Sequence, residues 1–175
     1  FFPVMLALIL INYLCGLGLE RFEQNKTARL ILLLIALAGS LGMLFYFKYA
    51  NFVLSSINAI FGTGFAPIQG ISVLPLGISF YTFQTLSYTI DVYRGKLAPE
   101  RDFVTFALFV SYFPQLVAGP IERAENLLPQ LKEEHPFSYD NAVSGLKLMA
   151  WGFFKKCVAA AYLAMWVDPV YGNVT

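Results

Sequence analysis

One apolar stretch of the chain carries polar side chains at helical spacing. It spans Pro75–Gly95 and reads PLGISFYTFQTLSYTIDVYRG. At roughly 100° per residue, Gln84, Tyr88 and Asp91 fall on one stripe together with Gly77. An amide, a phenol and a carboxylate at membrane depth are a functional hypothesis, because they are costly to leave in lipid. We therefore expect Gln84, Tyr88 and Asp91 to line a polar passage through the protein.

A second polar stripe lies on the opposite side of the same predicted helix. It holds Thr82, Thr85 and Thr89, which we expect to pack on neighbouring helices. Polar groups on two faces predict protein or water on both sides of the helix. The alternative for both stripes is simple interhelical bonding, and a threonine can also bond its own backbone. Asp91 and Arg94 could equally form a local ion pair at the helix end.

Further along the chain, isolated polar residues are candidates for contact with a substrate. Gln115 could donate a hydrogen bond to a carbonyl oxygen. Arg123, and the neighbouring pair Lys155 and Lys156, could hold a phosphate group or a lipid head group through charge-assisted contacts. The alternative is that these cations are ordinary anchors at the membrane surface.

The familiar motifs of catalysis and metal binding are absent from the sequence. It has no phosphate-binding glycine loop, no HExxH motif, no cluster of His and Cys, and no GxSxG elbow. The one histidine, His135, lies among glutamates and precedes a proline, so we expect no catalytic role for it. Cys15 and Cys157 lie far apart in apolar runs, which predicts two buried thiols without a disulfide. These residues predict no metal site and no bound cofactor.

Composition indicates an integral membrane protein. The chain has 175 residues, of which 58% are hydrophobic and 13% charged, whereas soluble domains have about a quarter charged residues. The net charge of +1, without a basic run, argues against a nucleic-acid partner. The chain starts at Phe1-Phe2-Pro3 without a methionine or a charged signal-peptide region, so we expect a piece of a longer membrane protein.

The apolar segments predict an all-α, polytopic membrane helix bundle. They form a single transmembrane domain over residues 1–175, with segments at about 3–19, 27–49, 74–93, 103–118 and 141–167. Pro114 and Gly119-Pro120 interrupt the fourth segment, which predicts a broken or re-entrant helix. Phe52–Phe61 could be a short helix in the interface. Whether 103–118 and 141–167 cross the bilayer fully stays open.

Charge in the loops predicts the orientation. The loops 20–29 and 94–101 each hold three cations, and residues 51–70 hold none. By the positive-inside tendency, the first two face the cytoplasm and the third faces outward.

Three ordered blocks of sequence resemble a known family. They are Pro75–Gly95, YFPQLVAGPIER at Tyr112–Arg123, and WGFFKKCVAAAYLAMWVDPVY at Trp151–Tyr171. Together they resemble the membrane-bound O-acyltransferase family, and within it the bacterial branch of alginate O-acetyltransferase-like enzymes that modify polysaccharides. The chain would be an N-terminal to central fragment of such a protein, with an MBOAT-type fold.

The resemblance implies a function for the whole protein. It implies transfer of an acyl group, most simply acetyl, to hydroxyls of an extracytoplasmic polysaccharide or cell-wall polymer. It implies a multi-pass protein of the bacterial cytoplasmic membrane. The implied partners are the lipid bilayer, the polymer, proteins that deliver it, and an acyl donor: acyl-CoA, an acyl carrier protein or another acyl thioester.

The catalytic base of that family is a histidine C-terminal to these blocks. No residue here matches it, so we expect no catalytic residue in this fragment. Two alternatives stay open: a polytopic transporter or channel, because polar stripes in broken-helix bundles are typical of those as well, and a non-catalytic scaffold of a polymer-export complex.

Overall fold

The computed structural model describes residues 2–68, 75–116, 119–134 and 136–172, and every regular element in these ranges is a helix. The all-α prediction is therefore confirmed for this part of the chain. The chain forms two compact units, Phe1–Glu133 and Glu134–Thr175. The single-domain organisation of residues 1–175 stays a prediction.

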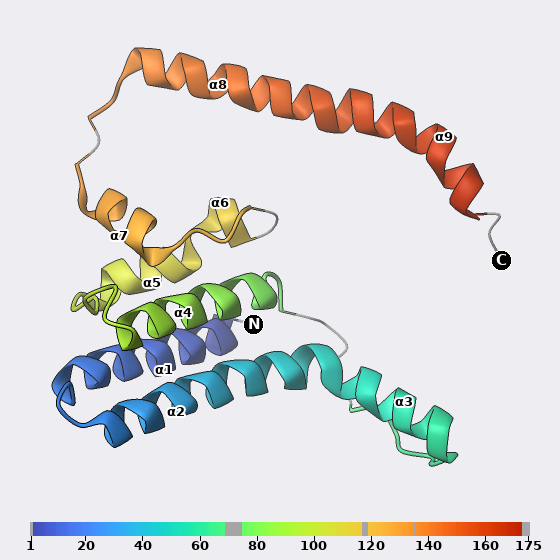
Figure 1. Cartoon of the computed structure of the whole chain (residues 1–175). Helices are drawn as coiled ribbons and strands as arrows, with labels where there is room; N and C mark the ends of the chain where they lie inside the picture. The colour runs from blue at the N-terminus through green and yellow to red at the C-terminus, as the bar shows by residue number, and fades with distance from the viewer. Residues whose placement is uncertain (1, 69–74, 117–118, 135, 173–175) are drawn as a thin grey trace. The chain divides into compact units, whose positions relative to one another are not determined.

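The first unit begins with a helical hairpin of α1 (Phe2–Arg21) and α2 (Lys26–Leu44) (Figure 1). Asn25 begins α2, since its side-chain oxygen accepts a hydrogen bond from the Ala28 N–H at 3.1 Å. α2 continues through the π-helical turn η1 (Phe45–Tyr49) into α3 (Ala50–Phe61). The segment predicted at 27–49 and the separate helix predicted at Phe52–Phe61 are therefore one helical run, with a change of direction between α2 and α3 (Figure 1).

Helix α4 (Ile78–Tyr93) packs on both α1 and α2. It begins later than the polar block suggests, because Gly77 adopts a left-handed conformation with φ of 74° just before it. Its 16 residues span about 24 Å, which is shorter than the roughly 30 Å of a bilayer core. The central helix is thus shorter than the full crossing expected from the sequence.

The predicted break within the segment 103–118 is confirmed. Asp102 begins α5 (Phe103–Ser111), accepting hydrogen bonds from the N–H groups of the first turn. The helix ends at Tyr112, whose ψ of 101° is not helical. The short α6 (Phe113–Leu116) follows and has Pro114 in its first turn, where no N–H is needed.

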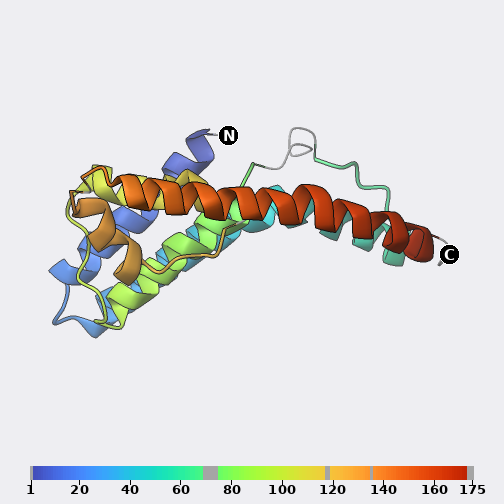
Figure 2. The same ribbon diagram turned by 90° about the horizontal axis from the view of Figure 1, so that it is seen from above.

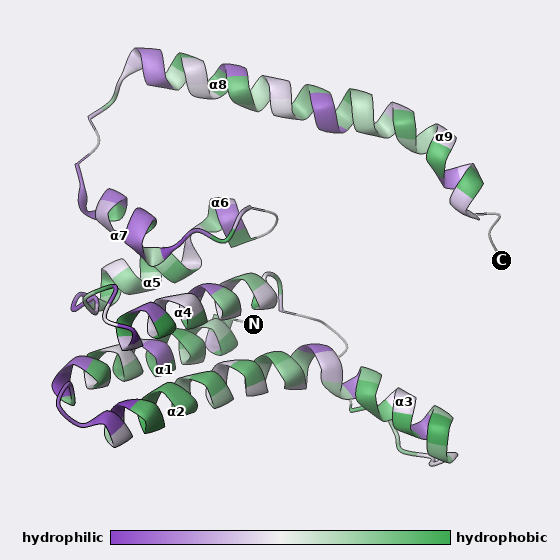
Figure 3. Cartoon of the chain, in the orientation of Figure 1, coloured by the Kyte–Doolittle hydropathy of each residue, from purple (hydrophilic) through white to green (hydrophobic). Residues whose placement is uncertain are grey.

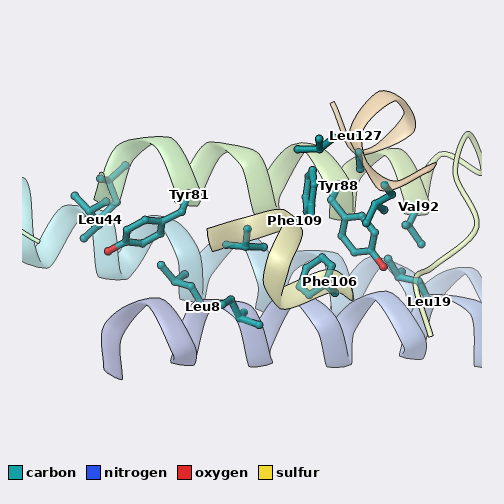
Figure 4. Packing of buried hydrophobic residues seen from close by; sticks show 14 residues of the cluster. Leu8, Leu19, Leu44, Tyr81, Tyr88, Val92, Phe106, Phe109 and Leu127 are labelled. Atoms are coloured by element: carbon teal, nitrogen blue, oxygen red, sulfur yellow. The ribbon is translucent and has the colours of Figure 1, made fainter. Parts of the chain in front are cut away.

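Helix α7 (Ala124–Lys132) packs on α5 and α4 and completes the first unit. The core of this unit lies between α1, α2, α4, α5 and α7 (Figure 4). Tyr88 and Phe106 are in contact at its centre, with ring centroids 4.6 Å apart, and Phe109 completes an aromatic cluster. The fully or nearly buried apolar residues are Leu8, Ile9, Leu19, Leu44, Ile78, Tyr81, Tyr88, Val92, Phe106, Phe109, Val110, Ala124, Leu127 and Leu128.

The second unit is one long helix, formed by α8 (Tyr139–Phe154), η2 (Lys155–Ala160) and α9 (Ala161–Gly172), and Figure 2 shows it as an uninterrupted rod. Ser138 caps it, accepting a hydrogen bond from the Asn141 N–H. The helix is longer at both ends than the predicted segment 141–167. Cys157 is exposed rather than buried, because its unit has no other helix to cover it.

Helix length and surface character identify the membrane-spanning candidates. Three helical stretches are long and apolar enough to cross a bilayer: Phe2–Arg21, Lys26–Phe61 and Tyr139–Gly172. Figure 3 shows α2 and α3 as mainly hydrophobic, while hydrophilic residues gather in the loops after α1 and α4. Large apolar side chains of α2, such as Leu30 and Leu34, are exposed in this unit. Such a surface is expected to face lipid rather than water.

Candidate functional site in the polar core of the helical bundle

One face of α4 joins α1 and α2 through a buried hydrogen-bond network. The Asn12 side chain donates to the Ser40 hydroxyl at 2.9 Å and to the Leu8 carbonyl at 2.9 Å. The Thr89 hydroxyl donates to the Asn12 side-chain oxygen at 2.8 Å. Asn12, Ser40 and Thr89 are completely buried, so these bonds replace water that folding removed.

The other two threonines lie on the same side of α4 and are equally buried. The Thr85 hydroxyl donates to the Thr82 carbonyl at 2.9 Å, within its own helix. The Thr82 hydroxyl has no hydrogen-bond partner. The structure thus places the threonine stripe against protein.

On another side of α4, Gln84 supports the broken helix. Its side-chain amide donates to the Phe109 carbonyl at 2.8 Å. Phe109 lies in the last turn of α5, where carbonyls have no partner within the helix. Because Gln84 is only 1% exposed, this bond both satisfies a buried amide and fixes the end of α5.

Tyr88 connects α4 to the loop that leads into α5. Its hydroxyl accepts a hydrogen bond from the Glu100 N–H at 2.9 Å. The Glu100 carboxylate, which is 7% exposed, accepts from the Asp102 N–H at 3.1 Å and pairs with the Lys132 ammonium at 2.6 Å. The tyrosine ring also lies close to Gly16, where an added Cβ would be 3.1 Å from the hydroxyl oxygen. Tyr88, Glu100 and Lys132 therefore connect α4, the loop and α7.

Asp91 is placed differently from the other two members of its stripe. It is half-buried near the end of α4. It forms no ion pair with Arg94 within the described residues, so that alternative is not realised there. Gln84 and Tyr88 are enclosed by protein, and the lining of a passage by this stripe stays a prediction.

Gln115 in α6 is the buried candidate with spare hydrogen-bonding capacity. It is 6% exposed, and its side-chain oxygen accepts from the Glu122 N–H at 3.4 Å. Its side-chain N–H₂ group is buried and has no partner among the described residues. A buried amide donor that is left free costs free energy, so such a group is suited to a ligand or an ordered water.

The cationic candidates are exposed. Arg123 lies at the start of α7 in the first unit. Lys155 and Lys156 lie in the π-helical turn of the second unit, with the Lys155 ammonium 5.3 Å from the centroid of the Trp151 ring. His135 lies outside the described residues. Within the described residues, no group of three potential metal ligands occurs.

A groove of about 630 Å³ lies beside α7, at the level where the chain leaves α6. It is lined by Tyr112, Glu122, Glu125, Asn126, Leu127, Pro129 and Gln130. Gln115 is bonded to one of these residues, Glu122, and Arg123 follows it in the chain. Gln115 and Arg123 thus each adjoin Glu122, a residue of this groove, without lining it themselves.

Two exposed groups at the loop before α5 have shifted pKa values. The Thr105 hydroxyl and backbone N–H groups of the first turn donate to Asp102 and lower the pKa of its carboxyl. The Glu20 carboxylate accepts a hydrogen bond from Arg101 at 2.8 Å and raises the pKa of that guanidinium. In both cases the hydrogen bonds stabilise the charged form of the side chain, and these bonds hold the loop in place.

Sequence reasoning missed four residues of this polar core. Asn12 is a single amide within a long apolar run, and this pattern could have indicated a buried polar contact. Ser40 was hidden in a patch of small residues. Glu100 and Lys132 lie in polar segments where charges are ordinary, so only the tertiary contact reveals their pairing.

These features define a helical membrane protein with a polar, hydrogen-bonded core and a broken helix held against it. The chain is similar to proteins described as probable alginate O-acetylase AlgI. One, from Pseudomonas putida, is 38% identical over 173 residues, which cover 98% of this chain and 36% of that protein. One from Pseudomonas aeruginosa is 37% identical over 162 residues, covering 91% of this chain and 31% of that protein.

A peptidoglycan O-acetyltransferase from Helicobacter pylori is 32% identical over 201 residues, covering 100% of this chain and 38% of that protein. The chain belongs to the membrane-bound O-acyltransferase family, as the three sequence blocks indicated. It spans about a third of the length of the curated relatives that it matches. No family model matches the chain. No solved structure matches it either.

Proposed function

We propose that the chain is part of a membrane O-acyltransferase that transfers an acyl group, most simply acetyl, to hydroxyls of an extracytoplasmic polysaccharide or cell-wall polymer. The observation that carries the proposal is the similarity over nearly the whole chain to proteins named for alginate and for peptidoglycan O-acetylation. Both of those polymers lie outside the cytoplasmic membrane. A multi-pass protein of the bacterial cytoplasmic membrane would place the reaction beside them.

The proposed reaction needs a base, an acyl donor and an oxyanion site. A base removes the proton of the attacking hydroxyl while its oxygen adds to the carbonyl of the acyl thioester. The oxyanion that forms is stabilised by donors aimed at it. It collapses to the ester as the C–S bond breaks, and the leaving thiolate takes up the proton that the base removed. The family resemblance puts the base histidine beyond this fragment. The donor would be acyl-CoA, an acyl carrier protein or another acyl thioester.

Within that scheme, we assign this chain the support of the polar path. Gln84 and Tyr88 would position the broken helix, because their hydrogen bonds go to backbone groups of α5 and of the loop before it. Gln115 would offer its free N–H₂ group to a substrate carbonyl. Asp91 and Arg123 would line the path, and the Lys155–Lys156 pair would bind a phosphate or head group.

The experiment uses the full-length parent protein. Acyl esters are measured on the cell's polymers in the parent strain, in a deletion strain, and in the deletion strain that carries the gene again. Esters should disappear on deletion and return with the gene. Ester content that does not change on deletion contradicts the proposal.

The same strains separate the enzyme from a transporter, which the broken α5–α6 pair within a polar bundle would also suit. Movement of a solute that depends on the gene, without any change in polymer esters, would support the transporter. Loss of esters with normal polymer export favours the enzyme over a scaffold of the export complex.

Alanine variants of the parent then test the site. We expect Gln84→Ala to lower the amount of protein in the membrane, because it leaves the end of α5 without its hydrogen bond. We expect Gln115→Ala, Asp91→Ala, Arg123→Ala and Lys156→Ala to lower acyl transfer at normal abundance. If abundance and activity fall together in the second group, those residues hold the fold and do not line the path.

A further inference from the structure

A half-buried cation near the start of α2 lacks a counter-charge. The Arg29 guanidinium donates to the Tyr93 carbonyl at the end of α4, and its central carbon is 5.4 Å from the centroid of the Tyr93 ring. Its Nε–H is buried and has no acceptor in the part of the chain that the structure describes. The ion pairs of the described residues are Arg101–Glu20 and Lys132–Glu100, so Arg29 has no carboxylate partner there. A charge withdrawn from water without a partner is costly, which indicates that an anion completes the site.

Two cavities adjoin Arg29, and their charges differ. One of about 310 Å³ is also lined by Glu20 and Glu23, whose negative charges oppose an anion. The other, of about 240 Å³, is lined by Lys26, Arg29 and Tyr93 and by no carboxylate among the described residues. Lys26 is three positions before Arg29, so both cations lie on one side of α2. The positive end of the α2 dipole adds to their field.

The position of the second cavity indicates the source of the anion. It lies where α2, a membrane-spanning candidate, begins, and hence at the expected boundary between membrane and water. In the following turns of α2, Leu30 and Leu34 are exposed, offering an apolar surface to acyl chains below the charged cavity. Cations directly above an exposed apolar helix face are typical of contacts with anionic lipids.

We propose that the cavity formed by Lys26, Arg29 and Tyr93 binds the phosphate of an anionic phospholipid head group. The Arg29 guanidinium and the Lys26 ammonium donate to phosphate oxygens, and the acyl chains lie along Leu30 and Leu34. The phosphate supplies the counter-charge that Arg29 lacks among the described residues. This site is independent of the proposed acyl transfer, since none of its residues belongs to the proposed path.

The test uses the purified parent protein and native mass spectrometry, with phosphatidylglycerol as the anionic probe and phosphatidylcholine as the neutral one. The wild type should retain phosphatidylglycerol in preference to phosphatidylcholine. Lys26→Gln keeps the bond between Arg29 and Tyr93, so it should fold normally and retain the anionic lipid about fivefold less well, as loss of one cation predicts. The double variant Lys26→Gln, Arg29→Gln should lose the preference.

Arg21→Gln is the matched control, because Arg21 is an exposed cation of the neighbouring loop and lines neither cavity. It should retain the lipid as the wild type does. Equal losses in Arg21→Gln and Lys26→Gln would mean a general charge effect and overturn the site. Unchanged retention in the double variant would also overturn it.

Inorganic phosphate in lipid-free detergent separates the two sources of the anion. One outcome is that inorganic phosphate raises the unfolding temperature of the wild type but not that of Lys26→Gln, while the protein retains phosphatidylglycerol and phosphatidylcholine equally. In that case the cavity binds free phosphate and the lipid assignment is wrong. Preference for phosphatidylglycerol that survives excess inorganic phosphate supports the lipid.

Discussion

The polar residues of the core divide by the groups to which they are bonded. Thr85 and Thr89 are completely buried on one helix, and the Thr85 hydroxyl is bonded within α4. The Thr89 hydroxyl is 3.1 Å from the Thr85 carbonyl of its own helix, but it also reaches Asn12 of α1 at 2.8 Å. A hydroxyl bonded to its own helix adds nothing to the association of helices. A hydroxyl bonded across helices does so, by roughly 1 kcal/mol in membranes.

Thr89→Val should therefore destabilise the bundle more than Thr85→Val. We expect Thr89→Val to lower the free energy of unfolding by about 1 kcal/mol, because the Asn12 oxygen loses its donor. The volume and burial of the two sites are matched, so Thr85→Val is the control. The measurement is unfolding of the parent protein in mixed micelles, and equal losses for the two variants would contradict a bridging role for Thr89.

Asp102 should make the start of α5 sensitive to acid. Its folded pKa is lowered below the ordinary aspartate value by the Thr105 hydroxyl and backbone N–H groups, so its contribution is present above that ordinary value. The contribution is lost as the pH falls through the lowered folded pKa. We expect the midpoint temperature of unfolding to fall in the wild type as the pH drops below the ordinary aspartate pKa and through the lowered folded pKa.

Asp102→Asn, which can still cap the helix, is the control for this prediction. It should be less sensitive to pH in the same range, because it has no carboxylate to protonate. An acid dependence that is identical in the two proteins would assign the effect to other carboxyls.

At the scale of elements, two glycines with the same backbone conformation meet different surroundings. Gly77 before α4 has φ of 74° and Gly95 after it has φ of 71°. A Cβ at Gly77 would be 2.7 Å from the Leu116 carbonyl of α6, whereas one at Gly95 would meet nothing within 4 Å. The first glycine thus allows α6 to approach α4, and the second only allows the turn.

Gly77→Ala should accordingly cost more than Gly95→Ala. Both variants should lose about 1–2 kcal/mol of unfolding free energy, because alanine is strained in the left-handed backbone conformation. Only Gly77→Ala must also displace α6, so it should have the lower unfolding temperature and lose acyl transfer in the parent protein. Equal behaviour of the two variants would mean that α6 is free to move away without consequence.

At the scale of the whole molecule, the first unit brings both basic loops to one end. Arg101 pairs with Glu20, and the Tyr13 hydroxyl donates to the Arg101 carbonyl at 2.6 Å. Figure 3 shows the hydrophilic residues of both loops at that end. Loops on the same side of a membrane agree with the positive-inside prediction, whereas the choice of the cytoplasmic side stays a prediction.

Labelling tests that choice. Single cysteines at Asn25, Gly64 and Lys96, in a parent protein without Cys15 and Cys157, are treated with a thiol reagent that does not cross membranes. From outside, only the cysteine at Gly64 should react, because the other two loops are expected to face the cytoplasm. A reaction at Asn25 or Lys96 would reverse the orientation, and detergent-opened membranes provide the control for access.

The sequence alone determined the class of the protein, its family and the broken segment after residue 103. These follow from composition, from ordered motif blocks and from Pro114, which are local properties that no distant contact can hide. It also determined that the central helix has protein on more than one side, because polar residues on two faces do not suit lipid.

Only the tertiary structure decided which partners those polar residues have. Asn12 and Thr89 are 77 positions apart, and Lys132 and Glu100 lie in segments whose pattern shows ordinary surface charge. The close approach of the Leu116 carbonyl of α6 to Gly77, just before α4, is likewise a tertiary contact. Such pairings depend on how helices meet in three dimensions, and helical periodicity specifies a face but not its neighbour.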